Sequence, residues 1–486
     1  MSPFLLAIDG GSQSTKVSVL DASGQVHATA QAPLRPYTLT PDGQAVHPDD
    51  DLWDSLVAAC REALATWRGS ASAIVGIGLC GIRFCRVYLD AAGHLTEPVL
   101  SWMDARVSQP IDPAVLDPAV ATITSAGGYL AVRLTGERRD SYASFQGMWP
   151  IDPVARDWSH DDHVLAQVGM PRSLLPDLVD PGALLGRVTR AAADATGLPV
   201  DCPVFATSND KAVEALGCGL DDDHTLLLSL GTYICSMTIG DDPRAGDDRY
   251  WVNTAAVPGR FLYESGGIRR GMWTVSWLRD LVSAQAPPGL SAVQVQQWLN
   301  AGAAEVPPGS AGLFTVPDWL APTHAPWRRG AIVGLVGGHG PFHLYRSILE
   351  GIVLTMHQRA GEMGEALGRS FSRLVVSGGG SRSDVMMSVV ADVFGMPASR
   401  TAVPDAVAVG AAICAAVGAR VHGSFEAAMA AMVRPGDTVE PDPLRQESYQ
   451  VVTRQYAALP LYTDPMFQRL ASLGGAVPPT DDPSPR

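Results

Sequence analysis

Short apolar runs that end in small polar turns alternate along this chain with longer stretches whose apolar residues have helical spacing. The first run, residues 4–8, ends at Asp9, and a turn rich in glycine and serine leads to a second apolar run. This pattern predicts two strands joined by a tight loop. The arrangement returns at 225–239, where Gly231 and Thr232 separate two apolar runs. One such hairpin in each half of the chain predicts a duplicated α/β fold; two unrelated hairpins are the alternative.

Segments with helical spacing of apolar residues predict the helices of the chain. They lie near residues 51–67, 272–285, 291–303, 342–367, 385–394 and 406–419. The stretch 120–200 is predicted to be mostly helical with proline-rich joints. The apolar segment 406–419 is shorter than the ~20 residues that a membrane span needs, so we expect a buried helix there. The proline-rich tail, residues 471–486, is predicted to be disordered.

The first turn carries residues that suit a phosphate group. Asp9 stands at the end of its strand, where a metal ion could be held. Glycines such as Gly11 let backbone N–H groups approach a ligand, and successive N–H groups form an anion-binding nest. The Ser12 hydroxyl and the Lys16 ammonium stand beside it. The turn is therefore a candidate cradle for the metal-bound tail of a nucleotide; a simple hairpin with Lys16 in solvent is the alternative.

Two further segments have polar or glycine residues where a strand meets a helix. Asn209 and Asp210 follow the apolar strand 203–205 and precede a helical segment. Either side chain could cap that helix, because a side-chain oxygen there accepts hydrogen bonds from free N–H groups; alternatively, Asp210 is a general base that faces the site. Near the C-terminus, glycines 378–380 lie between strand 374–377 and a helix. A flat ligand can lie against three consecutive glycines, although a flexible linker has the same composition.

Seven motifs follow one another along residues 1 to about 420. They are Asp9-Gly10-Gly11-Ser12 with Lys16, Trp102-Met103-Asp104-Ala105-Arg106, Arg133-Leu134-Thr135-Gly136-Glu137, Asp210 with Gly217, Leu230-Gly231-Thr232, Tyr345-Arg346-Ser347-Ile348-Leu349-Glu350-Gly351 and residues 378–392. In this order they resemble the FGGY family of carbohydrate kinases, in particular its xylulokinase branch, within the actin-like ATPase superfamily. The resemblance implies an α/β fold of two ribonuclease-H-like domains, 1–222 and 223–470, with the active-site cleft between them.

The resemblance also implies an activity, the ATP-dependent phosphorylation of a small sugar, with a ketopentose such as xylulose as the substrate. Asp210 would be the catalytic base and Asp9 would bind Mg²⁺. The residues implied in ATP binding are Gly11, Ser12, Lys16, Gly231, Thr232, Gly379, Gly380 and Asp384. Those implied in sugar binding are Arg83, Trp102, Asp104 and Asp210. Arg106 is expected to pair with a nearby carboxylate.

Departures from the family pattern leave the substrate open. The loop Cys80-Gly81-Ile82-Arg83-Phe84-Cys85 stands where xylulokinases carry G-Q-M-H-G and glycerol kinases carry N-Q-R-E. Arg83 matches the arginine of the glycerol kinases. Ser12 replaces a more frequent threonine, and Met386 and Ser388 stand where many relatives have Trp and Gln, which leaves the adenine contacts open. Other acceptors therefore remain: another ketose, a polyol such as glycerol or erythritol, or a sugar acid. The alternatives to this activity are an actin-like ATPase and a sugar sensor.

The composition limits the classes of molecule that this protein is expected to bind. The chain has 50 Asp and Glu against 35 Lys and Arg, for a net charge of −15, and no basic stripe, which argues against nucleic-acid binding. Its seven cysteines form no close C-x-x-C pair, so neither structural zinc nor a disulfide framework is expected. The N-terminus lacks a basic region and Asp9 interrupts its apolar run, so we expect no signal peptide. We predict a cytoplasmic protein without membrane contact; a homodimer is compatible with the sequence.

Two other patterns are discounted. Residues 76–81 fit G-x-G-x-x-G, but these glycines lie inside an apolar run rather than between a strand and a helix, so no dinucleotide site is expected. His339 and His343 have the spacing of zinc ligands on one helix face. Gly340 and Pro341 separate them, however, and we expect the two histidines at a helix entry.

Overall fold

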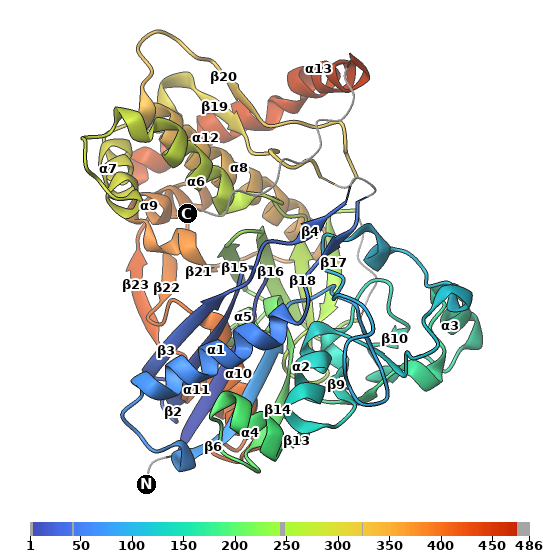
Figure 1. Ribbon diagram of the computed structural model, residues 1–486. Helices are drawn as coiled ribbons and strands as arrows, with labels where there is room; N and C mark the ends of the chain where they lie inside the picture. Colours follow the sequence, from blue (N-terminus) through green and yellow to red (C-terminus); the bar gives the residue numbers. More distant parts are fainter. Residues whose placement is uncertain (1–2, 41–42, 244–247, 323, 474–486) are drawn as a thin grey trace.

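The protein has two α/β halves, each built on one mixed sheet (Figure 1). The computed structural model describes residues 3–40, 43–243, 248–322 and 324–473. The six-stranded sheet of the N-terminal half has the order β13-β14-β6-β1-β2-β3. Its strands are β1 (Phe4–Gly10), β2 (Ser14–Asp21), β3 (Val26–Pro33), β6 (Ile74–Gly81), β13 (Leu184–Arg187) and β14 (Pro203–Asn209). Strand β1 pairs antiparallel with β2 and parallel with β6, so the first predicted hairpin is confirmed.

The seven-stranded sheet of the C-terminal half has the order β17-β18-β16-β15-β21-β22-β23. Strand β15 (Thr225–Leu230) pairs antiparallel with β16 (Ile234–Gly240) and parallel with β21 (Arg373–Ser377). The second predicted hairpin therefore exists and has the same kinds of neighbour as the first. The other strands are β17 (Tyr250–Thr254), β18 (Phe261–Ser265), β22 (Ala398–Thr401) and β23 (Pro435–Val439). The predicted duplicated α/β fold is confirmed.

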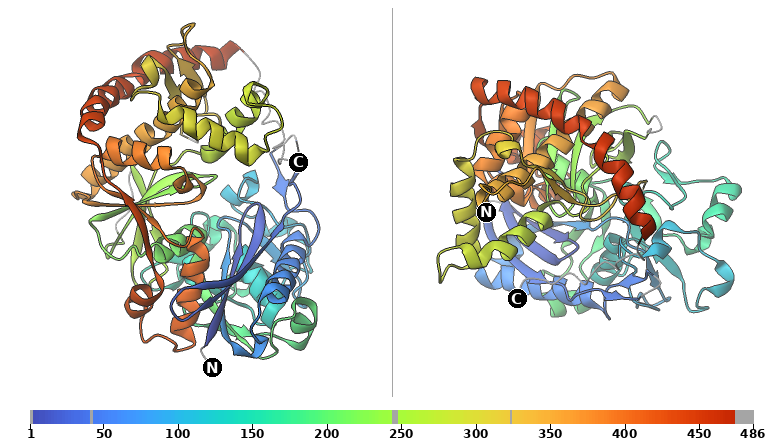
Figure 2. Two further views of the ribbon diagram at one scale, coloured as in Figure 1. Left: turned by 90° about the vertical axis from the view of Figure 1, so that its left-hand side faces the viewer. Right: turned by 90° about the horizontal axis from the view of Figure 1, so that it is seen from above.

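Strand β1 is buried on both faces, which explains why its sequence is apolar without alternation. Leu6 and Ile8 belong to a core that includes helix α1 (Asp51–Thr66), as predicted near 51–67. Leu5 and Ala7 belong to a core that includes α10 (Ala406–Gly418) and α11 (Phe425–Met432). These two helices come from the second half of the sequence but lie beside the first sheet (Figures 1 and 2). A domain boundary at 222/223 stays a proposal. Helices α10 and α11 come after this boundary in the sequence but pack beside the first sheet.

Helix α5 (Asp210–Gly217) packs against α10 at very short range. A Cβ on Gly217 would lie 1.8 Å from the carbonyl oxygen of Ala406, and a Cβ on Gly410 would lie 2.1 Å from that of Val213. Only glycine fits at both contacts, because real Cβ atoms essentially never come within 3.0 Å of another heavy atom. The core around this helix pair also includes Leu227 of the second sheet. Both sheets therefore fix the position of α5.

The helices that match the remaining predictions lie in the C-terminal half, where α8 and α9 contact the second sheet. They are α6 (Gly271–Val282), α7 (Ala292–Ala304), α8 (Pro341–Leu367) and α9 (Asp384–Phe394), followed along the chain by α12 (Pro443–Ala458) and α13 (Pro460–Leu473). Ile348 and Ile352 of α8 share a buried core with Leu228 of β15. His339 precedes α8 and His343 lies in its first turn, where its Nδ1 accepts a hydrogen bond from Gly340 N. Their predicted position at a helix entry is confirmed.

The prediction that residues 120–200 are mostly helical is wrong. This fully described stretch contains three short α-helices, α2 (Ala126–Thr135), α3 (Asp162–Val168) and α4 (Arg190–Thr196). Before and between them lie strands of two to four residues. Strands this short carry too little periodicity to be recognised in a sequence. An aromatic cluster that includes Phe145 and Trp158 gives the stretch a core of its own.

The remaining expectations concern the glycine pattern at 76–81, the cysteines, membrane spans and the C-terminal tail. Residues 76–81 lie within β6, which agrees with the rejection of a dinucleotide site. All seven cysteines are buried free thiols. In the ranges that the structure describes, no helix is long and apolar enough to cross a membrane. Of the predicted disordered tail, residues 471–473 are the end of α13, and residues 474–486 lie outside the described residues.

Candidate active site

The first hairpin places Asp9 and Lys16 opposite each other. The two residues are paired in the β1–β2 register, and the turn closes with a hydrogen bond of 3.1 Å from Gly11 N to Ser14 O. Lys16 Nζ lies 4.0 Å from an oxygen of Asp9 and 3.4 Å from an oxygen of Asp405, the residue that caps α10. Lys16 is therefore part of an ion-pair group rather than a free strand lysine.

Asp9 is a suitable carboxylate for a hydrated divalent cation. Burial and then the charge of Asp405 raise the pKa of Asp9 to about 7, although Lys16 lowers it. Asp210 and Glu214 add smaller contributions in the same direction. A cation beside Asp9 would relieve this repulsion. Within the described residues, no group of three or more His, Cys, Asp or Glu side chains could hold a metal ion alone. Mg²⁺ needs no such group, because it is commonly held by one or two carboxylates, several waters and substrate phosphates.

The second hairpin and the glycine run 378–380 meet at the adjacent strand ends. Gly378 has φ +82°, and a Cβ on it would lie 2.6 Å from the carbonyl carbon and oxygen of Leu230. This close approach requires glycine and brings the run beside Gly231 and Thr232. Helix α9 then begins at Asp384, whose exposed carboxylate lies 2.7 Å from Arg400. The structure thus gathers Gly231, Thr232, Gly379 and Gly380 at one edge of the second sheet, with Asp384 already paired.

Asp210 begins α5 directly after β14. Asn209, not Asp210, caps the helix, because the Asn209 side chain accepts a hydrogen bond of 3.1 Å from Ala212 N. The Asp210 carboxylate is therefore free for another role. Its Oδ1 atom is buried and accepts no hydrogen bond from any described residue. The nearest cation is Arg83, whose Nε lies 3.7 Å away, which is too far for a hydrogen bond.

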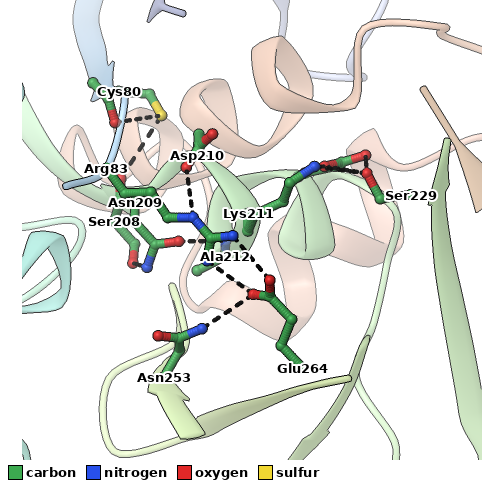
Figure 3. Close-up of polar contacts among 12 residues, drawn as sticks. Cys80, Arg83, Ser208, Asn209, Asp210, Lys211, Ala212, Ser229, Asn253 and Glu264 are labelled. Carbon is green, nitrogen blue, oxygen red and sulfur yellow. Dashed lines mark hydrogen bonds and ion pairs between the residues drawn. The ribbon is translucent and has the colours of Figure 1, made fainter. Parts of the chain in front are cut away.

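Arg83 crosses from the N-terminal half to the C-terminal half. Its two terminal nitrogens donate to the two carboxylate oxygens of Glu264, on β18, at 2.8 and 2.9 Å (Figure 3). Burial alone would lower the pKa of Arg83, but the charge of Glu264 raises it above its ordinary value. The guanidinium also lies 4.8 Å from the ring centroid of Trp251 and 5.2 Å from that of Phe84. A buried bidentate ion pair between aromatic rings thus joins the two halves beside Asp210.

A second buried ion pair adjoins Asp210. Lys211 Nζ donates to Glu214 at 2.9 Å and to Ser229 Oγ at 2.7 Å, and Ser229 Oγ donates to Glu214 at 2.8 Å (Figure 3). Ser229 lies in β15, two residues before Gly231. The residue after the candidate base is therefore tied to the strand that ends in the second phosphate turn.

The tryptophan motif lies beside the Arg83 loop. The Trp102 Nε1 atom is buried and donates no hydrogen bond to a described residue, so it can bind a ligand oxygen. Both Asp104 oxygens, in contrast, accept hydrogen bonds from within the protein, from Ala45 N, Arg106 N and the Arg106 guanidinium. The expected pairing of Arg106 with a local carboxylate is confirmed. Asp104 is only 1 % exposed, and sugar binding by this residue stays a prediction.

Two cavities flank these residues. One, of about 480 Å³, lies within the C-terminal half behind Tyr233 and Trp251 and has arginines such as Arg269 and Arg359 in its wall. The other, of about 470 Å³, lies between the halves and has Gln146 in its wall; Trp251 lines both. Asp210 lines neither cavity.

Sequence reasoning missed Glu264, Lys211 and Gln146. For Glu264 and Lys211 a signal was present. Glu264 is the one charged residue in the otherwise uncharged strand β18, and Lys211 follows Asp210 in a helix that is buried along most of its length. A charge inside a buried element requires a partner. Their partners, Arg83 and Ser229, are 181 and 18 residues away and could not be identified from the sequence. Gln146 lies in a segment without regular structure and gave no signal.

Comparison with known proteins agrees with this geometry. The profile of the FGGY family of carbohydrate kinases matches residues 4–113 with its N-terminal domain and residues 226–419 with its C-terminal domain. The uncharacterized sugar kinase YgcE of Escherichia coli (strain K12) is 40% identical over 470 residues, which is 96% of this chain and 95% of the relative. A glycerol kinase of Alkalilimnicola ehrlichii is 28% identical in an alignment of 478 positions that covers 88% of this chain and 92% of the relative.

Solved structures show the same fold. The crystal structure of xylulose kinase from Rhodospirillum rubrum has a TM-score of 0.81 at 27% identity and covers 96% of this chain and 100% of its own. That of Plasmodium falciparum glycerol kinase with ADP has a TM-score of 0.78 at 16% identity and covers 94% and 98% of the two chains. With its two sheets, paired hairpins and these likenesses, the chain belongs to the FGGY family of carbohydrate kinases and is an ATP-dependent sugar kinase with an actin-like fold.

Proposed function

We propose that the chain transfers the γ-phosphoryl group of ATP to a hydroxyl of a small sugar, with a ketopentose such as xylulose as the first candidate and Asp210 as the general base. The observation that carries this proposal is that the Asp210 carboxylate is close to, but not hydrogen-bonded to, its described neighbours. Its Oδ1 atom is buried, accepts no hydrogen bond within the described chain, and lies 3.7 Å from the nearest cation. A carboxylate kept free in this way can accept a proton from a bound hydroxyl.

In the proposed reaction, the acceptor oxygen forms a bond to the γ-phosphorus as the bond from that phosphorus to the β–γ bridging oxygen of ATP breaks, and ADP leaves. The proton of the acceptor hydroxyl goes to Asp210. Mg²⁺, when bound near Asp9, would supply neutralisation of phosphate charge. Phosphoryl transfer depends mainly on alignment and charge neutralisation. The chain's own contribution is therefore to hold the acceptor hydroxyl against Asp210.

The remaining site residues have the roles that their positions allow. Ser12 and Thr232, with the N–H groups of their turns, would hold the β- and γ-phosphates. Lys16 would contribute a cation, and Gly379 and Gly380 would lie against the adenosine. Asp384, on the same edge, would border it. Arg83 and Trp102 would face the acceptor.

A polyol such as glycerol is the second candidate acceptor, because Arg83 stands at the position of the glycerol-kinase arginine and a glycerol kinase is 28% identical to this chain. The likeness to the xylulose kinase of Rhodospirillum rubrum, at 27% identity, supports the ketopentose. Other ketoses and sugar acids belong in the same test.

The test is ADP release from the purified protein with Mg²⁺–ATP and a panel of pentuloses, hexuloses, polyols and sugar acids. We expect strong stimulation by one acceptor and a roughly 10²- to 10⁴-fold loss of kcat in Asp210→Asn with ATP binding retained. Asp223→Asn, at an exposed carboxylate outside the site, is the matched control and should be unchanged. Acceptor-independent ATP turnover would instead favour an actin-like ATPase, and near-normal turnover in Asp210→Asn would remove Asp210 from its role.

A further inference from the structure

A cavity of about 470 Å³ lies between the two halves, beside the residues around Asp210. Its wall on the N-terminal side is the segment that contains Phe145 and Gln146, and its wall on the C-terminal side includes Trp251 and Asn253 of β17. Among the described residues that line it, none carries a charge. The cavity is therefore a neutral space bounded by aromatic rings and by a few polar groups.

Two amide side chains in this cavity lack partners. Gln146 is only 8 % exposed, yet neither its Nε2 nor its Oε1 atom has a hydrogen-bond partner in the described part of the chain. Asn253 donates through Nδ2 to Glu264 at 3.2 Å, but its buried Oδ1 accepts no hydrogen bond there. A buried polar group without a partner costs about 1–3 kcal/mol, so native proteins rarely contain one that no ligand or water completes.

Hydrogen bonds link both walls of the cavity to residues that lie next to Asp210. The carbonyl oxygen of Ala143, three residues before Gln146, accepts hydrogen bonds from Asn209 Nδ2 at 3.1 Å and from Thr254 Oγ1 at 3.4 Å. Asn209 precedes Asp210, and Thr254 follows Asn253. On the other side, Asn253 donates to Glu264, and Glu264 is paired with Arg83. Arg83 Nε in turn lies 3.7 Å from Asp210 Oδ1, as Figure 3 shows. These contacts place the cavity in the neighbourhood of Asp210, so an acceptor whose reacting hydroxyl lies at Asp210 would have the cavity as the site for its far end.

We propose that this cavity binds the distal hydroxyl groups of the acceptor through Gln146 and Asn253, and that it selects a neutral polyhydroxylated chain of four or more carbons over a sugar acid. This inference rests on the proposed function. Amide groups both donate and accept, as hydroxyl groups do. A carboxylate in this space would be buried without a counter-charge, because Glu264 already neutralises Arg83. Such burial is strongly unfavourable.

The experiment compares kcat/KM for matched acceptors: a pentulose, the pentitol and the pentonate of the same carbon number, and glycerol. The wild-type protein should prefer the pentulose or pentitol to the pentonate by more than tenfold. In Gln146→Leu, the KM for five-carbon acceptors should rise about tenfold while the KM for ATP is unchanged. The effect on glycerol should be smaller, because three carbons at Asp210 extend less far toward Gln146.

Gln358→Leu is the matched control, since Gln358 lines the other cavity. It should leave all four acceptors unchanged. If Gln146→Leu does not fold, Gln146→Asn, which withdraws the amide by one methylene, replaces it with the same expectation. Preference for the pentonate, or equal effects of Gln146→Leu on glycerol and on five-carbon acceptors, would overturn the inference but leave the kinase proposal intact. Phosphorylation of no acceptor would remove the proposed function and this inference with it.

Discussion

The ion pair between Arg83 and Glu264 gives the sharpest prediction about catalysis. Glu264 binds both terminal nitrogens of the guanidinium, which leaves Arg83 Nε 3.7 Å from Asp210 Oδ1. In Glu264→Gln that restraint is lost. A shift of less than 1 Å would then bring Arg83 into a charge-assisted hydrogen bond with the candidate base, since such bonds are about 2.7–2.9 Å long.

The size of the effect follows from that geometry. A hydrogen bond to a charged group contributes about 1.5–3 kcal/mol, and each 1.4 kcal/mol is a factor of about ten. We therefore expect kcat of Glu264→Gln to fall roughly 10- to 100-fold. Loss of one partner from a buried pair also destabilises a fold by about 3–5 kcal/mol. Both side chains are buried here, at 9 % and 0 % exposure, so the full destabilisation should be observed.

The assay is ADP release at saturating ATP and acceptor, together with urea unfolding of the same variants. Arg83→Gln combined with Glu264→Gln should be more stable than the sum of the single changes predicts, because no unpaired charge remains. Asp180→Asn, at the exposed Arg156–Asp180 pair, is the control and should cost less than about 1 kcal/mol. Wild-type kcat and stability in Glu264→Gln would refute the reasoning.

Two further predictions concern acid stability and helix packing. Burial lowers the pKa of His47 to about 4 from 6.5, so the unfolded chain binds more protons than the fold between these values, and stability should fall as pH drops through 6.5 toward 4. His47 should account for roughly 2 kcal/mol of the free energy of unfolding that is lost between pH 7 and pH 5. Measured by urea unfolding, His47→Phe should therefore lose less stability over this range than the wild-type protein. An equal loss in both proteins would contradict this role of His47. Gly410→Ala should displace α5 and lower kcat, because its Cβ would lie 2.1 Å from Val213 O. Gly361→Ala, where a Cβ meets nothing within 4 Å, should be neutral or stabilising, and equal kcat in both variants would exclude this packing role.

Sequence reasoning succeeded where the signal is local. Both hairpins are visible because each strand is a short apolar run and each turn needs glycine beside a hydroxyl residue. The helices 51–67 and 342–367 are long enough to show their periodicity. It failed in 120–200, where strands of two to four residues are stabilised by pairing partners and by an aromatic cluster rather than by their own pattern.

In the candidate site, too, the residues with a local signal could be predicted and those that depend on long-range contacts could not. Asp9 and Asp210 stand at strand ends that the sequence marks. The pair beside Asp210 is different, because Arg83, in the turn after β6, and Glu264, in β18, are 181 positions apart in the sequence. That α10 lies beside the first sheet also depends on long-range packing, at Gly78 and Gly410, which no pattern in one segment reveals.

The residues on either side of Asp210 are bonded to different halves of the protein, so closure of the cleft between the halves would affect the position of Asp210. On one side, Asn209 donates to Ala143 of the N-terminal half at 3.1 Å. On the other side, Lys211 donates to Ser229 of β15 at 2.7 Å. The residues before and after the proposed base are therefore hydrogen-bonded to different halves of the protein, so we expect a rotation of one half against the other to shift Asp210. Since phosphoryl transfer depends on alignment as well as on charge neutralisation, the position of the proposed base between the two halves would couple domain position to catalytic geometry.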